Sequence, residues 1–193
     1  MEKKIKKIDP VYLILYLLVP VAVIAVCYTV MAVTGVIGNT AVALGFGPVI
    51  FAALWWILGG KVLYNNRKKA FEKNLTDTGF VRNHTFYGDG CTVVVDTVHR
   101  KLALLFRWNP MQSYVIPVGR IERAWVDDGR GGAGFLEGSS RVSFLFSVDG
   151  VNIRVNTFTS NKRWRMDSDH ILTGISKADL MVEVLNEARN QVN

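Results

Sequence analysis

Hydrophobic and charged positions divide the chain into two unlike parts. Between Pro10 and Gly60 there is no Asp, Glu, Lys, Arg or His, so 51 consecutive residues are uncharged. A run of this length exceeds any single helix in the core of a soluble protein, and it predicts membrane-spanning segments. After Lys61 the hydrophobic residues alternate with polar ones, a period of two that is typical of antiparallel strands with one face in water.

The uncharged run predicts a helical hairpin. Residues 11–33 are rich in Leu, Ile and Val, and a helix of these 23 residues is long enough to cross the hydrocarbon layer, which is about 30 Å thick. Residues 34–40 are turn-prone and predict a short external loop. Residues 41–60 predict the second transmembrane helix, because the glycines and the proline that they contain are tolerated in helices within a bilayer.

Basic residues on both sides of the hairpin predict its orientation. Residues 1–10 carry four lysines, and residues 61–78 form a basic juxtamembrane linker. Residues 65–78 predict a partly helical extension of the second span that breaks at Gly79. The loop 34–40 carries no charge, so the positive-inside rule predicts a multi-pass protein of the inner (cytoplasmic) membrane with both termini in the cytoplasm. We expect aromatic and basic side chains to anchor the hairpin at the membrane interface, namely Tyr12, Tyr16, Trp55, Trp56, Lys61, Arg67, Lys68 and Lys69.

A cleaved secretory signal is the alternative interpretation of the first apolar segment. Lysines, an apolar stretch and the small residues 41–43 (Ala-Val-Ala) are also the parts of a signal peptide. The apolar stretch is longer than the core of a signal, and a second apolar segment follows the expected cleavage site. These two differences favour a permanent membrane anchor. The absence of ionisable residues from the predicted spans argues against transport by this chain alone.

Residues 79–193 predict a cytoplasmic domain of about seven antiparallel strands followed by one helix. Asp149-Gly150 is the strongest hairpin signal, and the strand spacing favours a small sandwich or barrel. An apolar stripe after Ser176 predicts a C-terminal helix that is capped by this serine and covers the open end of the barrel. The expected strands are 79–87, 91–96, 100–107, 112–118, 120–127, 141–148 and 151–158.

The order and spacing of three expected strand segments are similar to those of pleckstrin-homology-like (PH-like) domains. These segments are Thr92–Asp96, Lys101–Leu105 and Tyr114–Ile121. A membrane α-helical hairpin followed by an α+β or all-β domain of this kind resembles the membrane-anchored bacterial PH-like proteins. The resemblance covers residues 79–192 and contains no catalytic motif. It implies a domain that binds lipids, peptides or other proteins, since a fold by itself does not determine a function.

One basic cluster around a tryptophan is the candidate contact surface of this domain. Lys162, Arg163, Trp164 and Arg165 follow the last expected strand. Tryptophan favours the headgroup layer, and each Lys or Arg near an anionic leaflet contributes about 1 kcal/mol, so the cluster predicts a membrane or partner surface. The alternative is a solvated loop whose Trp164 packs on the barrel.

Nucleic acid is the third interpretation of the basic cluster, and we expect no such partner. The chain has a net charge of +7, but much of the excess lies at the membrane flanks, where topology explains it. No RNA- or DNA-binding motif is present.

No arrangement of residues indicates catalysis, a cofactor or a metal. The glycine-rich stretch 129–134 lacks the Gly-Lys-Ser/Thr of a phosphate loop and predicts a loop between strands. His170 follows two aspartates, but no second ligand cluster accompanies them, so this segment predicts a turn. We therefore do not expect an enzyme.

The sequence favours a membrane-anchored binding or adaptor protein. Its PH-like domain is expected to engage a protein partner or the anionic membrane surface, and homo-oligomerisation stays open. The alternatives are an entry-exclusion or immunity protein of a mobile element, and an accessory subunit of a membrane complex.

Overall fold

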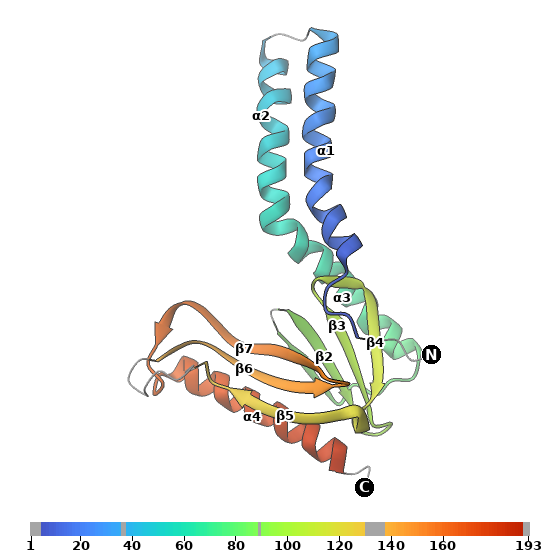
Figure 1. The fold of residues 1–193 in the computed structure, drawn as a ribbon, viewed down its shortest axis with the longest axis vertical. Helices are drawn as coiled ribbons and strands as arrows, with labels where there is room; N and C mark the ends of the chain where they lie inside the picture. Colours follow the sequence, from blue (N-terminus) through green and yellow to red (C-terminus); the bar gives the residue numbers. More distant parts are fainter. Residues whose placement is uncertain (1–4, 36–37, 89, 130–137, 191–193) are drawn as a thin grey trace. The chain divides into compact units, whose positions relative to one another are not determined.

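A computed structural model of the protein (Figure 1) contains two long apolar helices, then seven strands in two sheets, then a C-terminal helix. The residues that the structure describes are 5–35, 38–88, 90–129 and 138–190. The chain divides into two compact units. The helical unit comprises Lys6–Lys69 and Arg107–Met111, and the sheet unit comprises Met1–Ile5, Ala70–Phe106 and Gln112–Asn193.

The helical unit begins with α1 (Pro10–Thr34). The carboxylate of Asp9 accepts a hydrogen bond from the Val11 N–H at 3.0 Å, and Pro10 suits the first helical position because it needs no N–H partner there. The helix ends at Gly35, whose φ of 60° is left-handed. These bounds confirm the predicted helix over 11–33.

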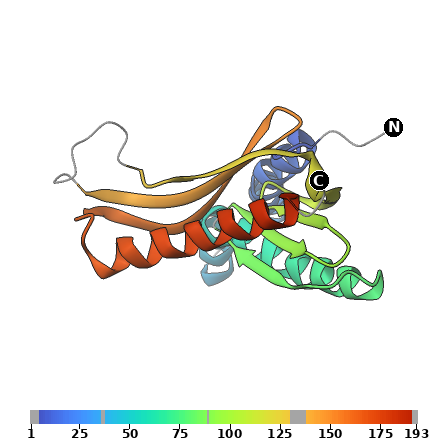
Figure 2. The same ribbon diagram turned by 90° about the horizontal axis from the view of Figure 1, so that it is seen from below.

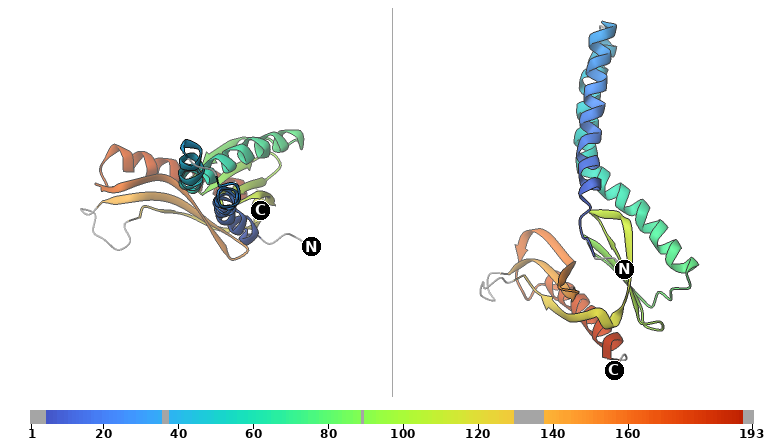
Figure 3. Two further views of the ribbon diagram at one scale, coloured as in Figure 1. Left: turned by 90° about the horizontal axis from the view of Figure 1, so that it is seen from above. Right: turned by 45° about the vertical axis from the view of Figure 1, so that its right-hand side comes forward.

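The second predicted helix is part of a longer helical segment (Figure 3). This segment consists of α2 (Asn39–Leu54), the π-helical turn η1 (Trp55–Gly59) and α3 (Gly60–Asp77). The predicted loop 34–40 reaches too far, because α1 includes Thr34 and α2 begins at Asn39. The expected helical extension of the second span is present as α3, and it begins earlier than residue 65. The predicted break at Gly79 is confirmed, because Gly79 has a φ of 73° and the Phe80 N–H donates to the Leu75 carbonyl at 3.0 Å.

The hydrophobic side chains of α1 and α2 are mostly exposed. By length and composition, Pro10–Thr34 and Val42–Asp77 are both able to cross a membrane, and only 11% of the most apolar window of each is buried. A core helix of a soluble protein buries its apolar face, and continuous apolar exposure is unfavourable in water. The two helices are therefore compatible with a membrane protein that has two spans.

The sheet unit contains two sheets, with strand orders β1–β2–β3–β4 and β5–β6–β7. The short helix η2 (Val118–Arg120) leads from the first sheet to the second. The seven predicted strands are confirmed in number and order. Their bounds are β1 (His84–Tyr87), β2 (Cys91–Asp96), β3 (Lys101–Phe106), β4 (Asn109–Pro117), β5 (Ile121–Asp127), β6 (Ser139–Val148) and β7 (Val151–Trp164).

Several strand ends differ from the prediction. β1 begins at His84 because residues 79–83 form the connection from α3, whereas β7 continues to Trp164 because it pairs with β6 as far as Ser139. Bulges within the β6–β7 pairing permit this length. The glycine-rich stretch 129–134 falls largely on residues outside the described ranges.

One hydrophobic core lies between the two sheets and α4 (Asp169–Asn190), and Figure 2 shows α4 along the second sheet. The predicted apolar stripe is confirmed, but the predicted start of the helix is wrong. Ser176 lies inside α4, because the stripe continues one turn earlier through Ile171 and Gly174, which are both buried. A side chain at 174 would place its Cβ 2.8 Å from the Cβ of Phe158, so a glycine is required for this close packing.

The prediction of a water-exposed face is wrong for β2 and β3. All residues of β2 and all of β3 except Lys101 are buried. The end of α3 lies over the second face of this sheet, where Phe71 and Leu75 are buried and Glu72 accepts a hydrogen bond from the Tyr87 hydroxyl at 3.1 Å. The continuous apolar runs in these strands are the sequence signal of burial on both faces.

Candidate functional site

The aromatic residues expected at the inner ends of the two spans meet inside the helical unit. The Tyr16 hydroxyl donates to the carbonyl oxygens of Trp55 and Trp56 at 3.0 and 2.8 Å. The Trp55 indole N–H donates in return to the Tyr16 carbonyl at 3.0 Å. Both acceptor carbonyls lie in the π-helical turn η1, where the regular hydrogen-bond ladder is interrupted and leaves backbone groups for partners outside the helix.

Tyr12 extends this aromatic cluster toward the start of α1. Its ring centroid lies 6.3 Å from that of Tyr16, and both tyrosines are buried against neighbouring protein. Trp56 is different, since 47% of it is exposed. Of the four expected interfacial aromatic residues, Tyr16 and Trp55 therefore join the two helices, Tyr12 is buried beside Tyr16, and Trp56 is exposed.

The basic anchors expected after the second span all lie on α3. Lys61, Arg67 and Lys69 are exposed, and Lys68 is half-exposed. They occupy the first turns of α3, directly after the π-helical turn. This placement next to an apolar helix is typical of the boundary between hydrocarbon and headgroups.

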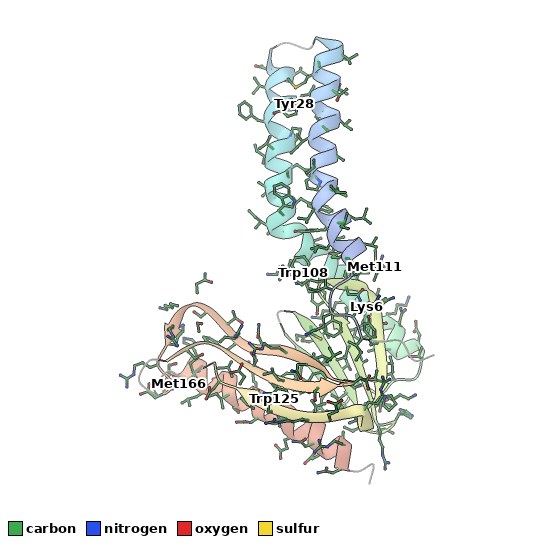
Figure 4. All side chains as sticks on the ribbon, in the orientation of Figure 1. Lys6, Tyr28, Trp108, Met111, Trp125 and Met166 are labelled. Atoms are coloured by element: carbon green, nitrogen blue, oxygen red, sulfur yellow. The ribbon has the colours of Figure 1, made fainter. Side chains whose placement is uncertain are left out.

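The turn between β3 and β4 joins the aromatic cluster, although no pattern in the sequence places it there. We name residues Arg107–Met111 the β3–β4 tip. The Trp108 ring lies edge-on to Tyr16 with centroids 5.9 Å apart, and the Trp108 carbonyl accepts from the Asp9 N–H at 3.0 Å. The Asn109 amide donates to the Lys6 carbonyl at 2.8 Å. Figure 4 shows Lys6, Trp108 and Met111 close to the start of α1.

Two exposed or unsatisfied groups stand out at the β3–β4 tip. The Cζ of Arg107 lies 5.6 Å from the centroid of the Trp108 ring, and its buried Nε finds no hydrogen-bond partner among the described residues. Met111 is 60% exposed. The sequence signal was an Arg-Trp pair before Asn-Pro in a hairpin turn, but only the contacts to α1 give it a location.

The basic cluster that includes Trp164 takes a different form from the expected one. Lys162, Arg163 and Trp164 are the last residues of β7, not a segment after it. The Trp164 indole is half-buried: its N–H donates to the Ser160 hydroxyl at 3.0 Å, and the Lys162 Nζ lies 4.2 Å from its ring centroid. This geometry favours the interpretation in which Trp164 packs on the domain.

Arg163 and Arg165, the two arginines of the cluster, are both exposed. Arg165 pairs with Asp167 at 2.8 Å, and both side chains are mostly exposed. The edge of the His170 ring lies near the Trp164 ring, with centroids 4.4 Å apart. Residues 166–168 form a turn, as predicted, whereas Asp169 and His170 already belong to α4.

A buried carboxylate at the end of β2 was not anticipated. The Asp96 side chain is inaccessible to solvent and accepts hydrogen bonds from the N–H groups of Val81 and His99 and from the His99 ring, at 2.9, 2.8 and 2.8 Å. Burial alone raises the pKa of Asp96, but these three hydrogen bonds outweigh it, so the pKa is lowered. Asp96 therefore joins the connection after α3 to the β2–β3 turn. Asp96 and Lys101 also line a pocket of about 320 Å³.

A second pocket opens between the edge strands of the two sheets. It has a volume of about 330 Å³ and lies between β1 and β7. Its apolar part includes the rings of Phe86 and Phe144, which contact each other edge-to-face at 6.1 Å, and Lys177 supplies a positive charge. We name this the β1–β7 pocket.

Among the described residues, no group of three or more His, Cys, Asp or Glu side chains is placed to hold a metal ion. Comparison of the chain with protein-family models, with curated proteins and with solved structures finds no match.

Proposed function

We propose that the protein is anchored in the inner membrane by two spans and that its sheet unit is a non-enzymatic cytoplasmic module that binds a protein partner. The observation that carries the anchor is the exposure of the apolar side chains of α1 and α2. Lipid chains cover such apolar surfaces, and most backbone groups of a helix are paired within the helix itself.

The orientation follows from charge. Lys6 and Lys7 precede α1, and Lys61 and Arg67 follow η1, whereas Thr34 and Asn39 on the other side carry no charge. Basic residues are retained on the cytoplasmic side, so both termini are cytoplasmic. The aromatic cluster then lies at the cytoplasmic interface.

The binding role is supported by the architecture of the sheet unit. Sheets of four and three antiparallel strands, followed by a helix that packs on their shared core, agree with the expected PH-like fold. The β1–β7 pocket lies between the edge strands of the two sheets and offers an apolar floor and the cation of Lys177. Strand edges bind extended peptides, so the partner segment is an extended chain with an apolar side chain next to a carboxylate.

The anchor and its orientation are tested with reporters fused to the C-terminus. We expect the chain to resist alkaline carbonate extraction, a fluorescent-protein fusion to be bright and an alkaline phosphatase fusion to be inactive. Active phosphatase or release by carbonate would overturn the proposal.

The binding role is tested by photo-crosslinking in native membranes. A photoreactive amino acid replaces Phe86 in the β1–β7 pocket, and the matched control replaces Val98, which is 64% exposed in the β2–β3 turn. We expect a discrete protein adduct at 86 that is lost in Lys177→Glu and absent at 98. Equal adducts at both positions, or none, would contradict a partner site in this pocket, whereas stoichiometric copurification would favour the accessory-subunit alternative.

A further inference from the structure

We propose that the β3–β4 tip, Arg107–Met111, is a third membrane contact that lies in the headgroup layer and binds a phospholipid phosphate through Arg107. This inference rests on the proposed two-span anchor. It assigns a lipid contact to a turn between two strands, outside the helices and outside the basic cluster on β7.

The location of the tip follows from its ties to the start of α1. The backbone of Trp108 bonds that of Asp9, and the Asn109 amide bonds the Lys6 carbonyl. Both partners immediately precede Pro10, where the span begins. A group fixed to residues 6 and 9 therefore lies at the depth where the chain enters the bilayer.

The Trp108 ring reaches further along α1. It contacts Tyr16, which is six residues after Pro10 and so about 9 Å along the helix axis. The tyrosine side chain leans toward the helix N-terminus, which brings the contact back toward the interface. The indole thus lies in the interfacial layer, the depth that tryptophan prefers in membrane proteins.

The chemistry of the tip matches a phospholipid. The Arg107 guanidinium forms no salt bridge within the described parts of the chain. Its Nε is enclosed by protein and has no hydrogen-bond partner there, so its two Nη groups are the donors that a phosphate is able to reach. Guanidinium binds phosphate with paired hydrogen bonds, and its N–H groups need acceptors in a medium of low polarity. Met111 is 60% exposed and supplies a flexible apolar side chain for the boundary with the acyl chains.

Depth measurement tests the location. Met111→Cys and, as a matched control, Val98→Cys are labelled with an environment-sensitive fluorophore in a Cys27→Ala background and reconstituted into phosphatidylcholine vesicles. The native Cys91 is 1% exposed and stays unlabelled. We expect the label at 111 to emit at shorter wavelength and to be quenched by lipids that carry a spin label at headgroup level, whereas the label at 98 behaves as in water. Water-like emission at both positions would overturn the inference.

Substitution of Arg107 tests the phosphate contact. In the Met111-labelled protein we expect Arg107→Gln to reduce headgroup quenching and Arg107→Lys to preserve most of it, equally in phosphatidylcholine and in phosphatidylglycerol vesicles, because both lipids carry the phosphate. Unchanged quenching in Arg107→Gln would contradict the proposed binding of phosphate by Arg107. An effect confined to phosphatidylglycerol would show attraction to surface charge and not phosphate binding.

Carbonate extraction of the same vesicles separates the two proposals. If the chain stays in the bilayer while the label at 111 is in water, only the tip contact fails. If carbonate releases the chain, the two-span anchor itself fails.

Discussion

Tyr16 and Trp55 hold each other by reciprocal hydrogen bonds: the hydroxyl of Tyr16 donates to the Trp55 carbonyl, and the indole of Trp55 donates to the Tyr16 carbonyl. Each side chain thereby binds the backbone of the other helix. The rings also contact each other, with centroids 6.0 Å apart. This pair defines the level at which α1 and the second helical segment meet.

Removing the Tyr16 hydroxyl is expected to loosen this junction. Tyr16→Phe loses the bonds to Trp55 and Trp56. A hydrogen bond between membrane helices contributes roughly 0.6 kcal/mol, so the expected loss of stability is about 1 kcal/mol. Tyr28→Phe is the matched control, because it loses one bond, to the Gly45 carbonyl, on an exposed side chain. Thermal melting in detergent measures both, and equal melting of Tyr16→Phe and wild type would contradict the role of the pair.

Cys91 is expected to react with maleimide only after unfolding. The thiol lies in the core with 1% exposure, and burial raises its pKa, so neither access nor thiolate is available in the folded state. A mass-shift assay on the Cys27→Ala variant compares native protein with protein in denaturing detergent. Rapid modification without denaturant would show that the core opens readily.

Asp96 is expected to make the sheet unit acid-sensitive. Its pKa is lowered from the ordinary value of 3.8, so its stabilisation is present above that pH and is lost as the pH falls through the lowered value. Asp96→Asn should unfold at a lower temperature at pH 7. Its free energy of unfolding should fall by roughly 1–3 kcal/mol, because it loses charge-assisted hydrogen bonds. The difference from wild type should shrink below about pH 4, near the usual pKa of aspartate.

The control for this measurement is Asp179→Asn on the exposed face of α4. We expect it to melt like wild type at every pH. A constant difference between Asp96→Asn and wild type from pH 7 to acid would show that the carboxylate does not carry the effect.

Gly174→Ala is expected to destabilise the sheet unit. The added Cβ would lie 2.8 Å from Phe158 and 3.3 Å from Val142, and overpacking of a core costs about 1–3 kcal/mol. Ser176→Ala is the control on the same helix. Because Ser176 is an exposed interior position of α4, its replacement should be neutral or slightly stabilising, whereas loss of an N-cap would cost about 1 kcal/mol. Chemical denaturation of both variants distinguishes these outcomes.

The sequence was sufficient to predict those helices and turns whose deciding residues lie close together in the chain. The uncharged run predicted α1, Gly79 predicted the end of α3, and Asp149-Gly150 predicted the β6–β7 hairpin. In each case the decisive residues lie within or next to the element, so hydrophobic period and turn chemistry were sufficient.

The errors have a common cause in contacts between distant parts of the chain. The second face of β2 is buried because the end of α3 covers it, and α4 begins before Ser176 because Ile171 reaches the core. The same holds for the candidate site. Trp108 could not be assigned to the site from the sequence, since only its contacts to residues 9 and 16 bring it to the start of α1.

The π-helical turn at Trp55–Gly59 has a consequence for membranes of different thickness. By presenting two carbonyls to one tyrosine, it prevents α1 and the neighbouring helix from sliding lengthwise past each other. In the proposed two-span anchor, a bilayer thinner or thicker than the helices would be matched by tilting the pair together or by deforming the lipid around both. The hairpin adapts to its bilayer as one body.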